Sequence, residues 1–107
     1  MNIQNAKVLI TGGNSGIGKA TAKLLKEKGA QVIISGRNEA TLQQTAKELK
    51  IDYIQADVTE ESQVQHMIKQ AKEKMGGLNT LINNAGYGYI SKLVDIEADK
   101  FLSLIHI

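Results

Sequence analysis

The stretch K-V-L-I-T-G-G-N-S-G-I-G at residues 7–18 decides the fold of this chain. Its apolar run at residues 8–10 predicts a buried strand that ends in a glycine-rich turn. A helical pattern, K-A-T-A-K-L-L-K-E-K, follows Gly18. This order forms a phosphate-binding site, because glycine lets the backbone approach an anion and the first helical N–H groups point at it.

The glycine spacing separates this stretch from other phosphate loops. Gly12, Gly16 and Gly18 form G-x-x-x-G-x-G, whereas the common dinucleotide fingerprint is G-x-G-x-x-G. It is not a P-loop, because Ala20 stands where a magnesium-binding hydroxyl is required. A plain tight turn needs far less glycine than the four found within seven residues. We therefore interpret the stretch as a dinucleotide-binding loop.

Composition bounds the class of protein. The chain has 107 residues, 42% of them hydrophobic and 22% charged, which is typical of one globular domain at most. Its net charge of +2 is too small to favour nucleic acid, and the absence of cysteine excludes disulfides and thiolate metal sites. The first residues lack the basic-then-apolar layout of a signal peptide, and no apolar run reaches membrane-spanning length. We expect a cytoplasmic protein without a metal site that binds neither nucleic acid nor membrane.

Strand-like and helix-like segments alternate along the rest of the chain. Strands are predicted at residues 31–35, 51–55 and 78–83, with helices between them. Asn38 and Thr59 are the predicted N-caps of the second and third helices. The predicted buried stripe of the third helix comprises Val64, Met67, Ile68, Ala71 and Met75.

The order βαβαβαβ predicts an α/β fold of three αβα layers. Strands separated by helices pair in parallel through right-handed crossovers, as in a partial Rossmann fold with sheet order 3-2-1-4 and later strands missing. The strand order reverses between the first and fourth strands, and a ligand crevice opens there. The glycine loop and the segment N-N-A-G at residues 83–86 both lie beside that crevice.

Arg37 is the only arginine and follows the second strand, beside the expected adenosine ribose. An acidic residue at this strand end would bind both ribose hydroxyls of NAD, whereas a guanidinium would pair with a 2′-phosphate. Gly36 stands in the place of the acid. We therefore predict that NADP(H) is preferred and that NAD(H) is possible, although a solvated surface arginine is the simpler alternative.

Asp57 follows the third strand and has two interpretations. Its carboxylate can accept a hydrogen bond from an adenine amino group, with the Val58 backbone nearby, or it can help to cap the next helix. Asn84, Ala85 and Gly86 follow the fourth strand, where small residues let a ribose and nicotinamide lie close to the backbone.

The segments T-G-G-N-S-G-I-G, S-G-R, A-D-V and N-N-A-G, in this order, resemble the classical short-chain dehydrogenase/reductase family up to about Phe101. The resemblance implies hydride transfer between NAD(P)(H) and a small carbonyl or alcohol substrate. It implies that the diphosphate and adenosine phosphate are held by Gly12, Asn14, Ser15, Gly16, Ile17 and Gly18. Arg37 would bind the 2′-phosphate, Asp57 and Val58 the adenine, and residues 84–86 the ribose and nicotinamide. Family members are usually dimers or tetramers, so we expect a homodimer or homotetramer for the parent protein.

The catalytic groups of that family are missing. Its serine and its Y-x-x-x-K pair have no counterpart, because Tyr53, Tyr87 and Tyr89 are not followed by lysine at the fourth position. The family's catalytic asparagine falls just beyond Ile107. We expect residues 1–101 to be the cofactor-binding part of a parent enzyme and the fragment alone to be inactive. The alternative is a non-catalytic NADP(H)-binding regulatory or sensor module, which the same glycine loop would serve.

The last residues, L-S-L-I-H-I at 102–107, do not resemble the family's helix. They can be encoded by the end sequence of a transposon that is used to prepare sequencing libraries. We expect residues 102–107 to be a non-native read-through tail. The fourth strand would then be an exposed apolar edge with Leu81 and Ile82.

Overall fold

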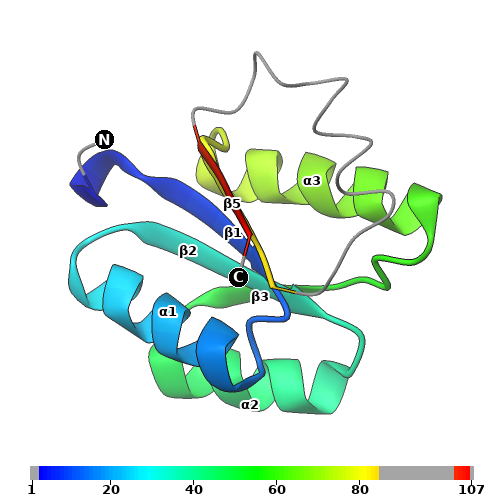
Figure 1. The fold of residues 1–107 in the computed structure, drawn as a ribbon, viewed down its shortest axis with the longest axis horizontal. Coiled ribbons are helices and arrows are strands. Elements are labelled where there is room, and N and C mark those ends of the chain that lie inside the picture. Colours follow the sequence, from blue (N-terminus) through cyan, green and yellow to red (C-terminus); the bar gives the residue numbers. More distant parts are fainter. Residues whose placement is uncertain (1–2, 85–102, 107) are drawn as a thin grey trace.

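The computed structural model describes residues 3–84 and 103–106 (Figure 1). A short 3₁₀ helix (Ile3–Asn5) leads into the alternating elements. The strands are β1 (Lys7–Thr11), β2 (Gln31–Gly36), β3 (Asp52–Gln55), β4 (Thr80–Asn83) and β5 (Ser103–His106). The helices are α1 (Gly16–Glu27), α2 (Glu39–Leu49) and α3 (Glu61–Met75).

The strands form one parallel sheet in the order β3-β2-β1-β4-β5. This order confirms the predicted 3-2-1-4 arrangement. β1 lies in the middle, and its last residue, Thr11, is opposite Ser35 of β2 and Asn83 of β4. The carboxyl ends of β1, β2 and β4 are therefore level, and the turns that follow them share one edge of the sheet.

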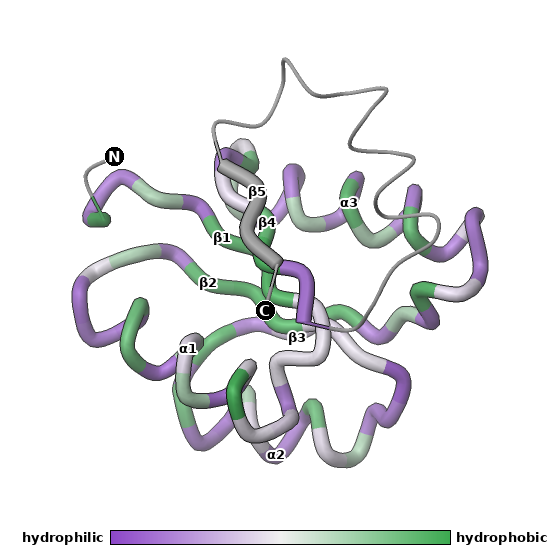
Figure 2. Tube along the Cα trace, viewed as in Figure 1, coloured by the Kyte–Doolittle hydropathy of each residue, from purple (hydrophilic) through white to green (hydrophobic). Residues whose placement is uncertain are grey.

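Helices cover both faces of the sheet, as a three-layer fold requires (Figure 1). α1 and α2 lie on one face and α3 on the other. Because successive strand side chains point to opposite faces, Val8 and Ile10 pack toward α1 and α2 while Leu9 packs toward α3. Figure 2 shows the same arrangement, with the hydrophobic segments concentrated in the central strands.

The third helix confirms one prediction and corrects another. The five residues of the predicted stripe are all buried. Thr59, however, is not its N-cap: Glu60 holds that position without a side-chain cap. The Thr59 N–H and hydroxyl donate instead to Asp57 Oδ1, at 2.9 and 2.6 Å. Its hydroxyl is therefore used in the preceding turn, a competition that residue type alone does not reveal.

The edge of β4 is not exposed, so that prediction is wrong. β5 pairs with β4 in parallel, from Thr80 opposite Ser103 to Asn83 opposite His106. An open strand presents unpaired N–H and C=O groups, and a neighbouring segment that can extend satisfies them. Such pairing needs only backbone, so the non-native origin of residues 102–107 stays a prediction.

The end of α2 generates a prediction about stability. Lys50 adopts the left-handed conformation, with φ of 59°, where glycine is favoured. We expect Lys50→Gly to stabilise the chain by about 0.5–1 kcal/mol, because the left-handed conformation strains a residue with a Cβ. Denaturant unfolding measures the change. Lys47→Gly, at an exposed helical position of α2, is the matched control and should destabilise by about 1 kcal/mol. Equal destabilisation by both variants would contradict this interpretation.

Candidate functional site

Packing of the chain itself accounts for three glycines of the loop between β1 and α1. Gly12 has a φ of 68°, which L side chains rarely adopt. A Cβ on Gly13 would lie 2.3 Å from Ile34 Cγ2, and one on Gly18 would lie 2.2 Å from the Gly12 carbonyl oxygen. These glycines let the loop fold back onto β2 and let α1 start against it.

Gly16 differs from its neighbours. Outside its own helical turn, a Cβ there would meet no atom of residues 3–84 or 103–106 within 4 Å, and its φ is not positive. Neither packing nor backbone conformation of the described residues therefore requires glycine at this position. The open space lies at the first residue of α1, where helical N–H groups have no intrahelical partner.

Ser15 leaves that helix start uncapped. It is the N-cap residue of α1, but its side chain makes no capping hydrogen bond. Its hydroxyl donates instead to the Gly12 carbonyl oxygen, at 2.8 Å. The start of α1 thus combines free N–H groups, the positive end of the helix dipole and open space, which together fit a phosphate group.

Asn84 joins the end of β4 to the glycine loop. Its side-chain Nδ2 donates to the Gly12 carbonyl oxygen and to Ser15 Oγ, both at 3.1 Å. Its backbone N–H donates to Thr11 Oγ1 at 3.1 Å, and the Thr11 hydroxyl donates to Asn83 Oδ1 at 2.8 Å. The two segments predicted to share the crevice are therefore bonded directly to each other.

A cleft of about 440 Å³ opens beside this junction. It is lined by Gly12, Asn14, Ser15, Gly36, Arg37, Asn38, Ala56, Asp57, Val58, Thr59 and Asn84. The residues come from the carboxyl ends of β1, β2, β3 and β4, the edge at which ligands bind in open α/β sheets. Seven of the twelve predicted site residues line the cleft.

The other five predicted residues are placed differently. Gly16, Ile17 and Gly18 form the first turn of α1 and are not among the lining residues. Ile17 extends into solvent, with 64% of its surface exposed. Ala85 and Gly86 lie outside the described residues.

Sequence reasoning did not assign Asn38, Ala56 or Thr59 to the site, and it treated Gly36 only as a missing acid. All four are immediate neighbours of predicted residues at strand ends. Ligands bind at the carboxyl ends of parallel strands. Considering every residue of the turns at that edge, rather than recognisable motifs alone, would have found them.

Arg37 and Asp57 face the same cleft from neighbouring strand ends. The Gln55 side chain donates to the Arg37 carbonyl oxygen at 3.0 Å and links the two turns. Hydrogen bonds from the Thr59 hydroxyl and N–H lower the pKa of the Asp57 carboxyl, and the Arg37 charge lowers it further. A carboxylate and a guanidinium thus both line the cleft.

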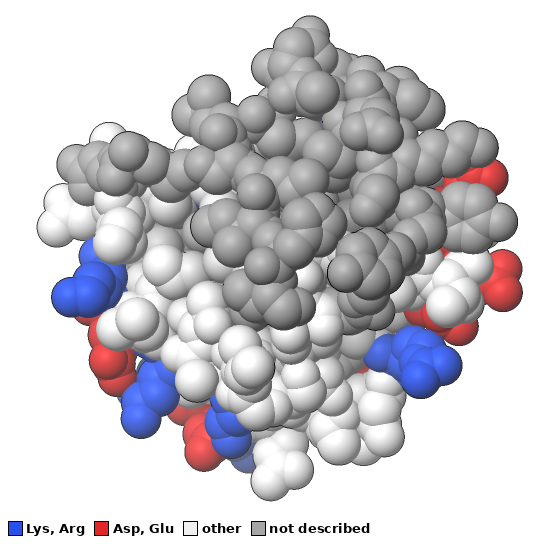
Figure 3. Space-filling model, viewed as in Figure 1, with Lys and Arg blue, Asp and Glu red and all other residues white. Residues whose placement is uncertain are grey.

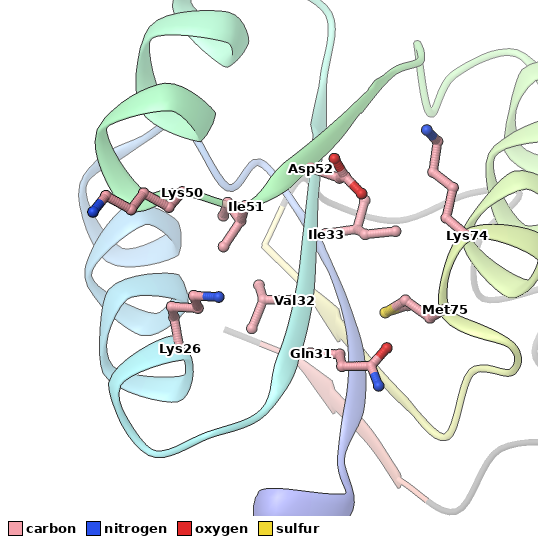
Figure 4. A pocket seen from close by; sticks show the side chains of 9 residues that line it. All are labelled: Lys26, Gln31, Val32, Ile33, Lys50, Ile51, Asp52, Lys74 and Met75. Atoms are coloured by element: carbon pink, nitrogen blue, oxygen red, sulfur yellow. The ribbon is translucent and has the colours of Figure 1, made fainter.

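A second hollow, of about 310 Å³, lies at the opposite edge of the sheet (Figure 4). Lys26 and Lys50 reach it from the α1 and α2 side, whereas Lys74 comes from α3 on the other side. Their ammonium groups do not converge in Figure 4. On the face seen in Figure 3, basic and acidic side chains also alternate rather than forming a patch of one sign. The cleft at the carboxyl ends is therefore the candidate site.

The family model of the short chain dehydrogenases matches residues 6–107. The chain belongs to this family. It is 40% identical over 111 aligned residues to an uncharacterized oxidoreductase of Staphylococcus aureus strain USA300, covering all of this chain and 48% of that protein. The chain therefore spans about half the length of this curated relative.

Solved structures agree with the family assignment. A short-chain type dehydrogenase/reductase from Mycobacterium ulcerans superposes with a TM-score of 0.76 at 32% identity, over 82% of this chain and 35% of that one. A 3-ketoacyl-(acyl-carrier-protein) reductase from Brucella melitensis, complexed with NADH, gives a TM-score of 0.71 at 31% identity, over 81% of this chain and 41% of that one. The partial Rossmann fold is that of the short-chain dehydrogenases.

Two further findings concern the residues that the structure describes. Among residues 3–84 and 103–106, no cluster of three or more His, Asp or Glu side chains is placed to bind a metal ion. No helix in this part of the short-chain dehydrogenase combines the length and apolar character needed to cross a membrane.

The Asp57 turn generates a prediction about pH. Because folding lowers the Asp57 pKa, its ionised form stabilises the folded state above the usual pKa of 3.8, and this stabilisation is lost as the pH falls through the folded-state value. We expect the stability difference between wild type and Asp57→Asn to be constant at neutral pH and to shrink below pH 3.8. Urea unfolding across pH measures it. Thr59→Ala, which removes the hydroxyl donor, should reduce the same pH dependence; an unchanged dependence in both variants would contradict the assignment.

Proposed function

We propose that this chain binds NADP(H) in the cleft at the carboxyl edge of the sheet and forms the cofactor-binding part of an oxidoreductase. Gly16 is the observation that carries the proposal. Nothing among the described residues requires glycine at this position, and a Cβ there would enter open space at the first residue of the uncapped helix α1. A cofactor diphosphate fits that space and the N–H groups beside it.

The charges around the cleft favour NADP(H) over NAD(H). Position 36 is glycine, so no carboxylate stands at the end of β2 to bind the ribose hydroxyls. Arg37 lines the cleft and forms no ion pair within the part of the chain that the structure describes. The guanidinium is therefore available for a 2′-phosphate. NAD(H) is the alternative cofactor, as the Brucella melitensis reductase is complexed with NADH.

The remaining cleft residues suit the other parts of the cofactor. We assign Asp57 and Val58 to the adenine; Asp57 Oδ1 is engaged by Thr59, which leaves Oδ2 as the acceptor. Gly12, Asn14, Ser15 and residues 16–18 surround the diphosphate. Asn84, with Ala85 and Gly86, borders the ribose and nicotinamide. The bonds from Asn84 to Gly12 and Ser15 hold these two regions at a fixed separation.

The bound cofactor would donate or accept the hydride, with a small carbonyl or alcohol as the other reactant. The chain's own residues bind and orient it, and the family's serine, tyrosine and lysine would come from the rest of the parent protein. We further propose that the parent is a cytoplasmic homodimer or homotetramer.

Substitution of Gly16 distinguishes an effect on nucleotide binding from an effect on folding stability. Gly16→Ala should leave the free energy of unfolding unchanged or slightly raised, because its Cβ meets no atom of the described residues outside its own helical turn. It should weaken NADPH binding by about tenfold or more, because the methyl group fills the diphosphate space. Calorimetric titration of the 107-residue chain measures this affinity.

Gly18→Ala is the matched control for this experiment. Its Cβ would lie 2.2 Å from the Gly12 carbonyl oxygen, so stability and binding should fall together. Undiminished NADPH binding by Gly16→Ala would refute the assignment of the diphosphate to the start of α1.

Substitution of Arg37 tests the cofactor preference. Arg37→Ala should weaken NADPH binding roughly 10- to 100-fold, since it removes charge-assisted hydrogen bonds to the 2′-phosphate. NADH binding should change by no more than about twofold, because NADH lacks that group. Lys69→Ala, at an exposed position of α3, removes a charge that does not line the cleft and serves as the control. Equal losses for both nucleotides in Arg37→Ala would rule out a 2′-phosphate contact.

A further inference from the structure

Position 36 is glycine for a reason other than backbone conformation. The φ of Gly36 is not positive, so its backbone conformation is open to residues with a Cβ. A Cβ built there would nevertheless lie 2.9 Å from Asn14 Oδ1 and 3.6 Å from Asn14 Cγ. Its contact with Leu42 Cδ2, at 3.5 Å, is ordinary van der Waals packing. The group that a side chain at the end of β2 would have to move is therefore the carboxamide of Asn14.

Asn14 is held in that position by α2. Its Nδ2 donates to Thr41 Oγ1 at 2.7 Å. Thr41 is itself oriented by the cap of α2, since its N–H donates to Asn38 Oδ1 at 3.2 Å and its hydroxyl donates to the Asn38 carbonyl oxygen at 3.1 Å. Because the hydroxyl proton is already used, Thr41 Oγ1 can only accept from Asn14.

This contact orients the carboxamide as well as restraining it. With Nδ2 directed to Thr41, Oδ1 is the atom that faces Gly36. A side chain at position 36 would displace Oδ1 and with it the carboxamide that donates to Thr41. Asn14 and Gly36 both line the cleft, whereas Thr41 supports Asn14 from behind it.

We propose that Asn14, positioned by Thr41, is a cofactor-specificity determinant: its carboxamide fills the space of a side chain at position 36 and bars the carboxylate that would bind the ribose hydroxyls of NAD(H). This inference rests on the proposed preference for NADP(H) and adds a second device to the charge of Arg37. Arg37 attracts the 2′-phosphate, and Asn14 keeps the competing acid out.

A double-mutant cycle tests the proposal with NADH and NADPH as probes on the 107-residue chain. Gly36→Asp alone should gain little NADH affinity, since the new carboxylate collides with Asn14. Asn14→Ala alone should weaken NADH and NADPH binding by a similar factor, because Asn14 also lies beside the diphosphate that both nucleotides carry. The double variant should bind NADH at least about fivefold more tightly than the product of the two single-variant changes in affinity predicts. The reason is that alanine at position 14 leaves room for the new carboxylate.

Thr41→Val provides a second route to the same result. It leaves the size of Asn14 unchanged but removes its acceptor, so Gly36→Asp with Thr41→Val should also gain NADH affinity beyond the product of the single effects. Gly36→Asp with Gln44→Ala, another exposed position of α2, should not. If the effects multiply independently in every pair, the proposal is wrong.

Stability without nucleotide gives an independent readout. Gly36→Ala introduces only the methyl group, and its cost in unfolding free energy should be smaller in the Asn14→Ala background than in the wild type. An equal cost in both backgrounds would show that the Asn14 carboxamide does not block position 36. A wild-type chain that binds NADH as tightly as NADPH would instead count against the proposed function, so the two failures are distinguishable.

Discussion

The side-chain amide of Asn84 bonds to the Gly12 carbonyl oxygen and to Ser15 Oγ, and the cleft depends on this junction. β1 and β4 are 72 residues apart at Thr11 and Asn83, yet they pair directly in the sheet. The bonds from Asn84 extend that pairing into the loops beyond the strands. Together with the bond from the Asn84 N–H to Thr11, they join the glycine loop to the end of β4.

The glycine loop contains two kinds of glycine. Gly12, Gly13 and Gly18 are required by the chain itself, because a side chain at any of them would strain the backbone or collide with Ile34 or Gly12. Gly16 and Gly36 are not required in this way. The first keeps space open at the start of α1, and the second leaves space that Asn14 occupies. The same residue type thus serves close packing, leaves open space at a helix start, and makes room for a neighbouring side chain.

Much of the fold could be predicted because it follows from local patterns. The apolar spacing of α3 and the strand–helix alternation imply buried faces and parallel pairing whatever the detailed contacts are. The errors occur where two local interactions compete or where a distant segment intervenes. Thr59 could cap α3, but Asp57 takes both of its donors. The edge of β4 was expected to be bare, but Ser103–His106 pairs with it.

By itself, the sequence determined the parallel α/β fold, the edge of the sheet at which the cleft opens, and Arg37 as the basic residue beside it. Strand ends and glycine spacing are properties of the chain order, so no contact had to be known. Only the tertiary structure decided which other side chains restrain the glycine-rich stretch of residues 7–18. The Asn14–Thr41 bond and the space over Gly16 depend on how α1, α2 and β2 meet, and spacing along the chain does not encode those distances.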